Sequence, residues 1–518
     1  MIETPDPSNS IAMPSSTEKV VLDSSHGTKD ALVHRYSRLS VIAFAFTTTN
    51  SWLAFGSGIA VPLISGGGPA LIYGLIVSGI VMATIGAGFA ELASAFPSAG
   101  GQYHIVYMVF PPKHRRSAAF VTAWMSILST ALGLASCNFF VASSIADLAA
   151  LWNLGYEPQA WQIYLLHVLL CVIGFIATSR FPGAIGRVGI AIFWLSLVGF
   201  AASIASVLAV SPEKQPASFV FKDYPNTSGW SDGFAFVLGV TGCLWAYSGV
   251  DGPTHLAEEV QNPSRNVPIA IGLTISLGFI TVVVWNIALL FAITDLEAIV
   301  ASGVPIIEVY RQSLNSKVGT TIFTIYYMVM FYDIVLNLFI FGGRIAWSLA
   351  RDGGVPYHRF FTQLDHASPV RATAMILGME IIVGILFVAS STAYNSFIGL
   401  TLFALNITVA LPQAALLFRG RDCLPRRAFS LGKFGYVVNG LSTAFVILFS
   451  VTFCFPTSIP VAPSSMNYLV VVMAGGWILI AIFWWAGLRR SFTGPTVTID
   501  ALAPSDTSEA KDEEEPKY

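Results

Sequence analysis

The sequence predicts an all-α membrane protein of about twelve transmembrane helices, and three observations support that prediction. Of the 518 residues, 54% are hydrophobic and only 11% are charged, whereas a soluble domain usually carries about 25% charged residues. The apolar residues gather in long runs, and a helix needs about 20 such residues to cross the hydrocarbon core of a bilayer. Lysine and arginine are concentrated in alternate loops between the runs, as in proteins that span a membrane repeatedly. Lipid must therefore be the main solvent of this chain.

Runs long enough to span a bilayer follow one another through the central part of the chain. They fall near 39–64, 70–94, 117–145, 161–180, 187–210, 232–256, 268–293, 318–349, 372–391, 394–418, 434–456 and 467–488. A membrane domain is therefore expected over residues 37–490. Residues 1–36 are polar and Ser-rich, which predicts a disordered tail. Residues 491–518 end in an acidic run and predict a second, solvated tail.

The basic residues of the loops predict that both tails lie in the cytoplasm. With that orientation, the loops on the other side hold only Lys214, Lys222, Arg311 and Lys317. The cytoplasmic loops hold the larger set, which includes Lys113, Arg115, Arg116, Arg265, Arg351, Arg419, Arg421 and Arg427. We expect an integral protein of the plasma membrane.

Two of the predicted spans carry helix-weakening residues at matching places. The first contains Gly56–Gly58 followed by Pro62, and the sixth contains Ala246–Gly249 followed by Pro253. Glycine and proline free backbone groups, which lipid tolerates only where they line a cavity or are buried in protein. Two interrupted helices five apart predict an inverted repeat with a ligand site between its halves. The alternative is that the glycines only allow close helix packing.

The motifs of several functional classes are missing from the sequence. We find no P-loop, no Ser/His/Asp group and no cysteine or histidine spacing typical of a metal site. We therefore expect no enzyme activity, no cofactor and no metal. The lack of a basic patch argues against a nucleic-acid partner.

Four segments together resemble a known superfamily. They are Glu91–His104 (ELASAFPSAGGQYH), Tyr156–Gln159 (YEPQ), Glu258–Pro263 (EEVQNP, followed by Arg265 and Pro268) and Arg344–Pro356 (RIAWSLARDGGVP). Over roughly 38–490 the chain resembles the amino acid–polyamine–organocation superfamily. Within it the chain is most similar to the fungal amino acid/choline transporter group, which includes choline and 4-aminobutyrate permeases.

The resemblance implies a five-plus-five inverted repeat like that of the leucine transporter, with helices 1 and 6 broken. It implies a secondary transporter that moves a small solute by alternating access. The expected solute is an amino acid or a related amine; choline or 4-aminobutyrate is the narrower alternative. A nutrient receptor that keeps the transporter fold but signals is the alternative of a different class.

The resemblance also assigns roles to residues at the two breaks. Backbone N–H groups of helix 1 would bind a substrate carboxylate, carbonyls of helix 6 would receive an ammonium, and an aromatic gate would cover the ammonium by a cation–π contact. On this chain the resemblance assigns the carboxylate-binding N–H groups to Ser57, Gly58 and Ile59. It assigns the ammonium-binding carbonyls to Ala246, Tyr247 and Ser248, and the aromatic gate to Trp245. A simple packing role is the alternative for Trp245.

Charged residues near the predicted cytoplasmic face could form an inner gate. They are Glu258, Glu259, Arg344, Arg351 and Asp352. Their opposite charges predict ion pairs, which either break and re-form during transport or form a static network. The stretch Pro97–Gly101 is expected to form a turn and to lead into a re-entrant helix.

Ionisable residues inside spans are costly and so suggest function. They are Glu91, His167, Asp251, Asp333 and Glu380. Asp251 follows the helix 6 break and Asp333 lies near the middle of helix 8, so both are candidates for proton coupling or ammonium binding. Glu91 is interpreted as facing water and His167 as packed and neutral, while Glu380 receives no role.

Two departures from relatives bear on the coupling ion. The 187–210 span has no lysine, which some bacterial relatives use in place of sodium. The helix 8 stretch Ile340–Gly343 has no hydroxyl, whereas sodium-coupled relatives place hydroxyls there. Both departures favour a proton as the coupled ion, with exchange and uniport left open.

Overall fold

The computed structural model describes residues 37–153, 155–365, 368–389, 391–461 and 466–495. Both predicted tails lie almost wholly outside these residues. The helices are α1 (Arg38–Thr49), α2 (Ser51–Ala54), η1 (Phe55–Ser57), α3 (Ala60–Ala95), α4 (Gln102–Val109), α5 (Arg115–Trp152), α6 (Ala160–Arg180), α7 (Pro182–Val210), α8 (Ala217–Phe221), α9 (Asp232–Cys243), η2 (Leu244–Tyr247), η3 (Gly252–Glu259), α10 (Pro263–Ala292), α11 (Leu296–Ala301), α12 (Pro305–Leu314), α13 (Lys317–Arg351), α14 (His358–Phe361), α15 (Val370–Ala389), α16 (Ser391–Arg419), η4 (Gly432–Phe434), α17 (Gly435–Thr452), α18 (Leu469–Phe483), η5 (Trp484–Leu488) and α19 (Arg489–Ser491).

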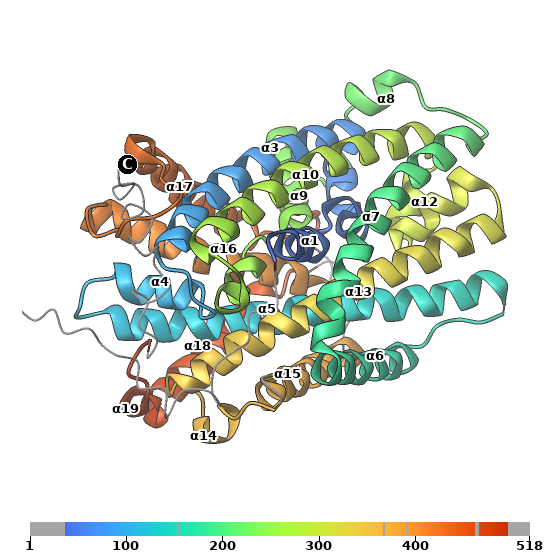
Figure 1. Ribbon diagram of the computed structural model, residues 1–518. Helices are drawn as coiled ribbons and strands as arrows, with labels where there is room; N and C mark the ends of the chain where they lie inside the picture. Colours follow the sequence, from blue (N-terminus) through green and yellow to red (C-terminus); the bar gives the residue numbers. More distant parts are fainter. Residues whose placement is uncertain (1–36, 154, 366–367, 390, 462–465, 496–518) are drawn as a thin grey trace, which may run out of the picture.

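Within the described residues, twelve helical spans are long and apolar enough to cross a membrane, which confirms the predicted number. The long helices run side by side, with α4, α14 and α19 at one end of the bundle and α8 and α12 at the other (Figure 1). Exposed leucine, isoleucine, valine and tryptophan side chains cover outer helices such as α6 and α18. Such a surface is stable only against lipid.

The boundary between the first two spans differs most from the sequence prediction. The first two spans were expected at 39–64 and 70–94, but the helix restarts at Ala60 and continues to Ala95 across a kink at Gly66 and Gly67. Gly67 has φ 63°, a left-handed conformation that favours glycine. A Cβ there would also lie 2.7 Å from the Pro225 ring. The chain therefore bends sharply at these two glycines, and it is helical on both sides of the bend.

Both predicted breaks are present. At the first, α1 ends at Asn50 in a left-handed conformation (φ 32°), and one turn of α2 and the 3₁₀ turn η1 follow. At the second, α9 gives way to η2, Ser248 is extended (ψ 147°), and Gly249 has φ 87°. The predicted glycine stretches thus mark both interruptions, although Asn50 at the start of the first was missed.

The two breaks lie against each other. A Cβ at Gly249 would be 3.4 Å from the Thr48 methyl group of α1, and the Trp245 indole donates a hydrogen bond to the Ala54 carbonyl at 3.2 Å. The long helix α5 packs against both α13 and α16 beside them. This arrangement places irregular backbone from two spans at one point inside the bundle.

Candidate functional site

A cavity of about 40 Å³ lies where the two breaks meet. It is lined by Thr48, Thr49 and Ala54 of the first span, Ser126, Ser129, Thr130, Gly133 and Cys137 of α5, Trp245, Ser248, Gly249 and Asp251 of the sixth span, Ile334, Leu338 and Phe341 of α13, and Thr401 and Leu405 of α16. A single water needs roughly 10–15 Å³ by the same measure. The cavity must therefore widen before an organic solute can enter.

Two of the predicted binding residues, Trp245 and Ser248, line this cavity, and so does Asp251, a candidate for proton coupling or ammonium binding. Ala246 and Tyr247 are buried beside it, and the Tyr247 hydroxyl donates to the Leu75 carbonyl of α3 at 3.0 Å instead of facing the cavity. The sixth span thus supplies an aromatic ring, a hydroxyl and a carboxylate to the cavity wall.

The predicted carboxylate-binding residues of the first span lie behind Trp245. The Trp245 indole donates to the Ser57 hydroxyl at 2.9 Å, and a Cβ on Gly58 would be 3.2 Å from the same ring. The Gly58 N–H already donates to the Phe55 carbonyl at 2.9 Å. Ile59 is buried and does not line the cavity.

Asp251 is the one acidic residue among the described residues that line the cavity, and none of those residues is basic. Its side chain accepts a hydrogen bond from the Gln102 amide at 2.5 Å, and its Oδ2 lies 3.3 Å from Nε2 of His255. His255 stacks on Phe341 with ring centroids 5.6 Å apart. Sequence reasoning missed Gln102 and His255, although the i, i+4 spacing of Asp251 and His255 was a usable signal.

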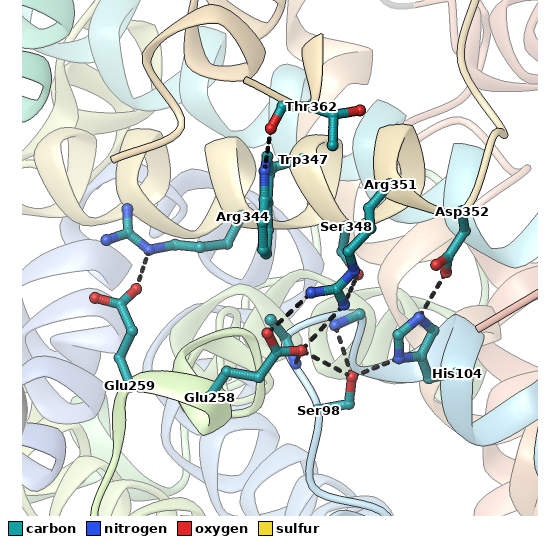
Figure 2. A network of polar contacts seen from close by, with 12 residues as sticks. Ser98, His104, Glu258, Glu259, Arg344, Trp347, Ser348, Arg351, Asp352 and Thr362 are labelled. Carbon is teal, nitrogen blue, oxygen red and sulfur yellow. Dashed lines mark hydrogen bonds and ion pairs between the residues drawn. The ribbon is translucent and has the colours of Figure 1, made fainter. Parts of the chain in front are cut away.

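The predicted charged residues pair at the end of the bundle that holds α4 and α14 (Figure 2). Arg344 donates to Glu259 at 2.6 Å, and both side chains are almost fully buried. Arg351 donates to both oxygens of Glu258 at 3.2 Å and covers the Trp347 ring. The prediction of ion pairs is confirmed for these two Arg–Glu pairs.

Asp352 contacts partners that the sequence did not reveal. It lies 2.8 Å from Nε2 of His104 and accepts a 2.8 Å hydrogen bond from Tyr103, both on α4. Burial raises the pKa of the Asp352 carboxyl, but the hydrogen bond and charge of His104, the charge of Arg351 and the hydrogen bond from Tyr103 together outweigh burial, so the pKa lies below its usual range. The carboxylate is thus ionised and holds α4 to the end of α13.

The turn Ser98–Gly101 connects this network to the cavity. The Ala99 N–H donates to Glu258 at 3.1 Å, while the Ala99 carbonyl lies 3.1 Å from Nδ1 of His255. Gly101 has φ 53°, and a Cβ there would lie 2.6 Å from His255. The predicted turn is present and leads into the short helix α4, and a single residue, Ala99, joins His255 beside the cavity carboxylate to Glu258 of the ion pairs.

The interpretation of Glu91 as facing water is wrong. Glu91 is 1% exposed, and it accepts hydrogen bonds from Arg421 at 2.6 Å and from Arg427 at 2.8 Å. The segment after α16 folds back onto α3, so two arginines assigned to a loop neutralise this carboxylate. The sequence alone could not show that the segment after α16 packs on α3.

Asp333 is buried but does not line the cavity. It accepts a hydrogen bond from the Asn337 amide at 3.1 Å, and the same amide lies 3.1 Å from the Thr47 hydroxyl of α1. Its helix neighbours Ile334 and Leu338 do line the cavity. Asp333 thus lies one layer behind the cavity wall, between α13 and the first span.

Comparison with known proteins identifies a family. The family model described as "Amino acid permease" matches residues 36–477. The choline transporter of Saccharomyces cerevisiae is 32% identical, covering 87% of this chain and 80% of that protein. An uncharacterized amino-acid permease of Schizosaccharomyces pombe is 27% identical over 92% and 89% of the two chains. The swainsonine transporter of Arthroderma benhamiae is 27% identical over 88% and 91%.

The two Arg–Glu pairs should differ in how much they contribute to the stability of the folded protein. Glu259→Gln leaves Arg344 buried without its counter-charge, which typically costs about 3–5 kcal/mol. Glu258→Gln affects a pair whose side chains are 13% and 18% exposed, so water can partly replace the lost charge. We expect the melting temperature of purified Glu259→Gln to fall clearly more than that of Glu258→Gln. Equal melting temperatures would show that burial does not separate the two pairs.

Proposed function

The chain belongs to the amino acid permease family, and from that membership we propose that it imports a small organic cation of the choline class by alternating access. It is a membrane transporter and not an enzyme. The observation that carries the choice of substrate is the cavity wall, where Asp251 supplies a negative charge and no described lining residue supplies a positive one. A buried carboxylate in such a site favours a cationic solute.

The other lining groups suit the rest of a choline-like molecule. Trp245 and Phe341 present aromatic rings, which attract a quaternary ammonium by about 0.5–2 kcal/mol each. The hydroxyls of Thr49 and Ser126 are buried without a hydrogen-bond partner, and both residues line the cavity. They could bind the hydroxyl of an amino alcohol. The similarity to a protein named choline transporter agrees with this reading.

An amino acid would also need donors for its carboxylate. The predicted donor at Gly58 is already hydrogen-bonded to Phe55, and Trp245 separates Ser57 from the cavity. Binding a zwitterion would therefore require Trp245 to move. Amino acids remain the alternative class, and a receptor without flux is the alternative function.

The turn Ser98–Gly101 supplies a route from substrate binding to the ion pairs, which we propose to be the inner gate. A cation at Asp251 would compete with the Gln102 amide for the carboxylate. Release of Gln102 loosens the turn whose Ala99 N–H binds Glu258. The Glu258–Arg351 pair then opens toward the side that the loop arginines assign to the cytoplasm. We propose plasma-membrane import with both termini on that side.

Competition for uptake tests the substrate class. Labelled choline should be taken up by cells that express the chain and should be displaced by unlabelled choline more effectively than by amino acids, 4-aminobutyrate or polyamines. Asp251→Asn should raise the KM for choline at least ~10-fold, because an interaction with a charged group contributes about 1.5–3 kcal/mol. Asp223→Asn, on an exposed loop, is the matched control and should leave KM unchanged.

Two results would contradict this assignment. Better displacement by a neutral amino acid than by choline would reject the choline class. Specific binding of choline without any flux would favour the receptor.

We propose that Asp333 carries the coupled proton, because it is buried beside the cavity without lining it. The wild-type chain should take up more substrate at acidic external pH. Its uptake should be lost with a protonophore and should not change when sodium is replaced by potassium.

The variant Asp333→Asn should keep exchange of substrate across the membrane but lose accumulation against a gradient. Loss of exchange in Asp333→Asn would make Asp333 a substrate counter-ion instead. Survival of both exchange and accumulation would leave it a structural hydrogen-bonding residue.

A further inference from the structure

A second cluster of polar side chains lies where α5, α6 and α15 meet, apart from the cavity and the ion pairs. His167 and Cys171 are one turn apart on α6, and Glu380 faces them from α15. All three side chains are fully buried, and one ligand atom of each lies within 4.8 Å of the other two. Neither the proposed transport function nor the family assignment uses these residues.

Several polar atoms of this cluster have no hydrogen-bond partner. They are Oε2 of Glu380, Nδ1 of His167 and Oδ1 of Asn138. Asn138, on α5, donates its amide to Glu380 Oε1 at 2.6 Å and to the Cys171 sulfur at 3.2 Å. Unpaired buried polar atoms each cost about 1–3 kcal/mol, and the lipid around α6 offers no water to satisfy them. The cluster therefore lacks a positively charged or multivalent partner.

The geometry points to a transition-metal dication as that partner, and we propose that His167, Cys171 and Glu380 form a structural Zn²⁺ site. In a tetrahedral zinc site with bonds of about 2.3 Å to sulfur and about 2.0–2.1 Å to nitrogen, the two ligand atoms lie about 3.6 Å apart. Nε2 of His167 lies 3.4 Å from the Cys171 sulfur. The Glu380 oxygen lies within 4.8 Å of both atoms, so an approach of at most roughly 1.5 Å would bring it to the separation of a tetrahedral site.

The charges of the ligands match a dication. When the metal binds, Cys171 releases its thiol proton to solvent and coordinates as a thiolate, and Glu380 releases the proton that neutralises the metal-free cluster and coordinates as a carboxylate. Two negative ligands and one neutral imidazole then give an uncharged complex with Zn²⁺. An uncharged complex costs less free energy to bury in a membrane than a charged one. A mixed nitrogen, sulfur and oxygen ligand set suits zinc and excludes magnesium or calcium, which prefer oxygen alone.

The surroundings hold the ligands in place. The His167 ring stacks on Phe139 of α5 with centroids 3.9 Å apart and planes 6° apart. Gly384, one turn after Glu380 on α15, leaves room for the imidazole, since a Cβ there would lie 2.8 Å from Nε2. Asn138 donates its amide to the Cys171 sulfur, and its Oδ1, which has no hydrogen-bond partner, supplies a fourth polar group beside the site.

A metal here would anchor α6. Only His167, Cys171, Gly174 and Thr178 of this helix are buried, so a single narrow stripe joins it to the bundle. Lipid provides no hydrophobic driving force for helix association. A bond from α6 to α15 through a metal would fix the position of the helix, and because the site is closed we expect the ion to be bound as the helices assemble.

The test is the metal content of the purified full-length chain, with any histidine tag removed. Protein from zinc-supplemented cells should contain about one zinc per chain. Cys171→Ser and Glu380→Gln should each lose most of it, while Cys454→Ser, which removes a cysteine outside the cluster, should keep it. Wild-type protein from zinc-depleted cells should melt at a lower temperature, and Cys171→Ser should show no such dependence on zinc.

A spectroscopic readout keeps the test valid if a variant folds poorly. Protein produced with Co²⁺ in place of zinc should show a thiolate-to-metal charge-transfer band in the near ultraviolet, which requires a coordinating cysteine. Cys454→Ser should retain the band and Cys171→Ser should lose it. If the wild-type protein contains no zinc and shows no cobalt band, the proposal is overturned, and the cluster is neutralised by a proton instead of a metal. Full retention of zinc by folded Cys171→Ser would overturn it as well.

Discussion

The rest of this structure depends on the requirement that a backbone inside lipid satisfies its own hydrogen bonds. Two spans violate helical geometry, at Asn50–Gly58 and at Leu244–Gly249, and each is tolerated because it faces the other. The Trp245 indole and the Ser57 hydroxyl both donate to the Ala54 carbonyl, which the broken helix leaves available. The cavity therefore lies where the interruptions of the first and sixth spans meet.

The turn Ser98–Gly101 and the start of α4 give this cavity a mechanical connection to the end of the sixth span that holds Glu258. Asp251 is the residue immediately before η3 and Glu258 lies in its last turn, so a short helix already links the two carboxylates. Gln102, the first residue of α4, donates to Asp251, and the Ala99 N–H in the turn before α4 donates to Glu258. A displacement at either carboxylate must therefore be accommodated by the other, which is the physical basis for the proposed coupling of binding to gating.

The features that the sequence could predict are those carried by local pattern. Span number follows from run length, and the breaks follow from glycine and proline, so both were predicted. The pairing of Arg344 and Arg351 with Glu258 and Glu259 followed from family motifs and opposite charge. The partners of Asp251 and Asp352 on α4, and of Glu91 in the segment after α16, are 149 to 336 residues away in sequence. Such contacts depend on which helices pack together in the fold, and the periodicity of a single sequence does not show this.

The central claim is that the cavity between the breaks opens and closes with substrate under the control of the Glu258–Arg351 pair. Cys137 is a native probe for this, since it lines the cavity and is only 3% exposed. Its rate of alkylation by a thiol reagent is measured in a chain whose other cysteines are replaced. The rate should be slowed by choline, and Glu258→Gln should increase it when the reagent is added from the side of the membrane that holds the ion pairs. A rate that responds to neither choline nor Glu258→Gln would contradict the account.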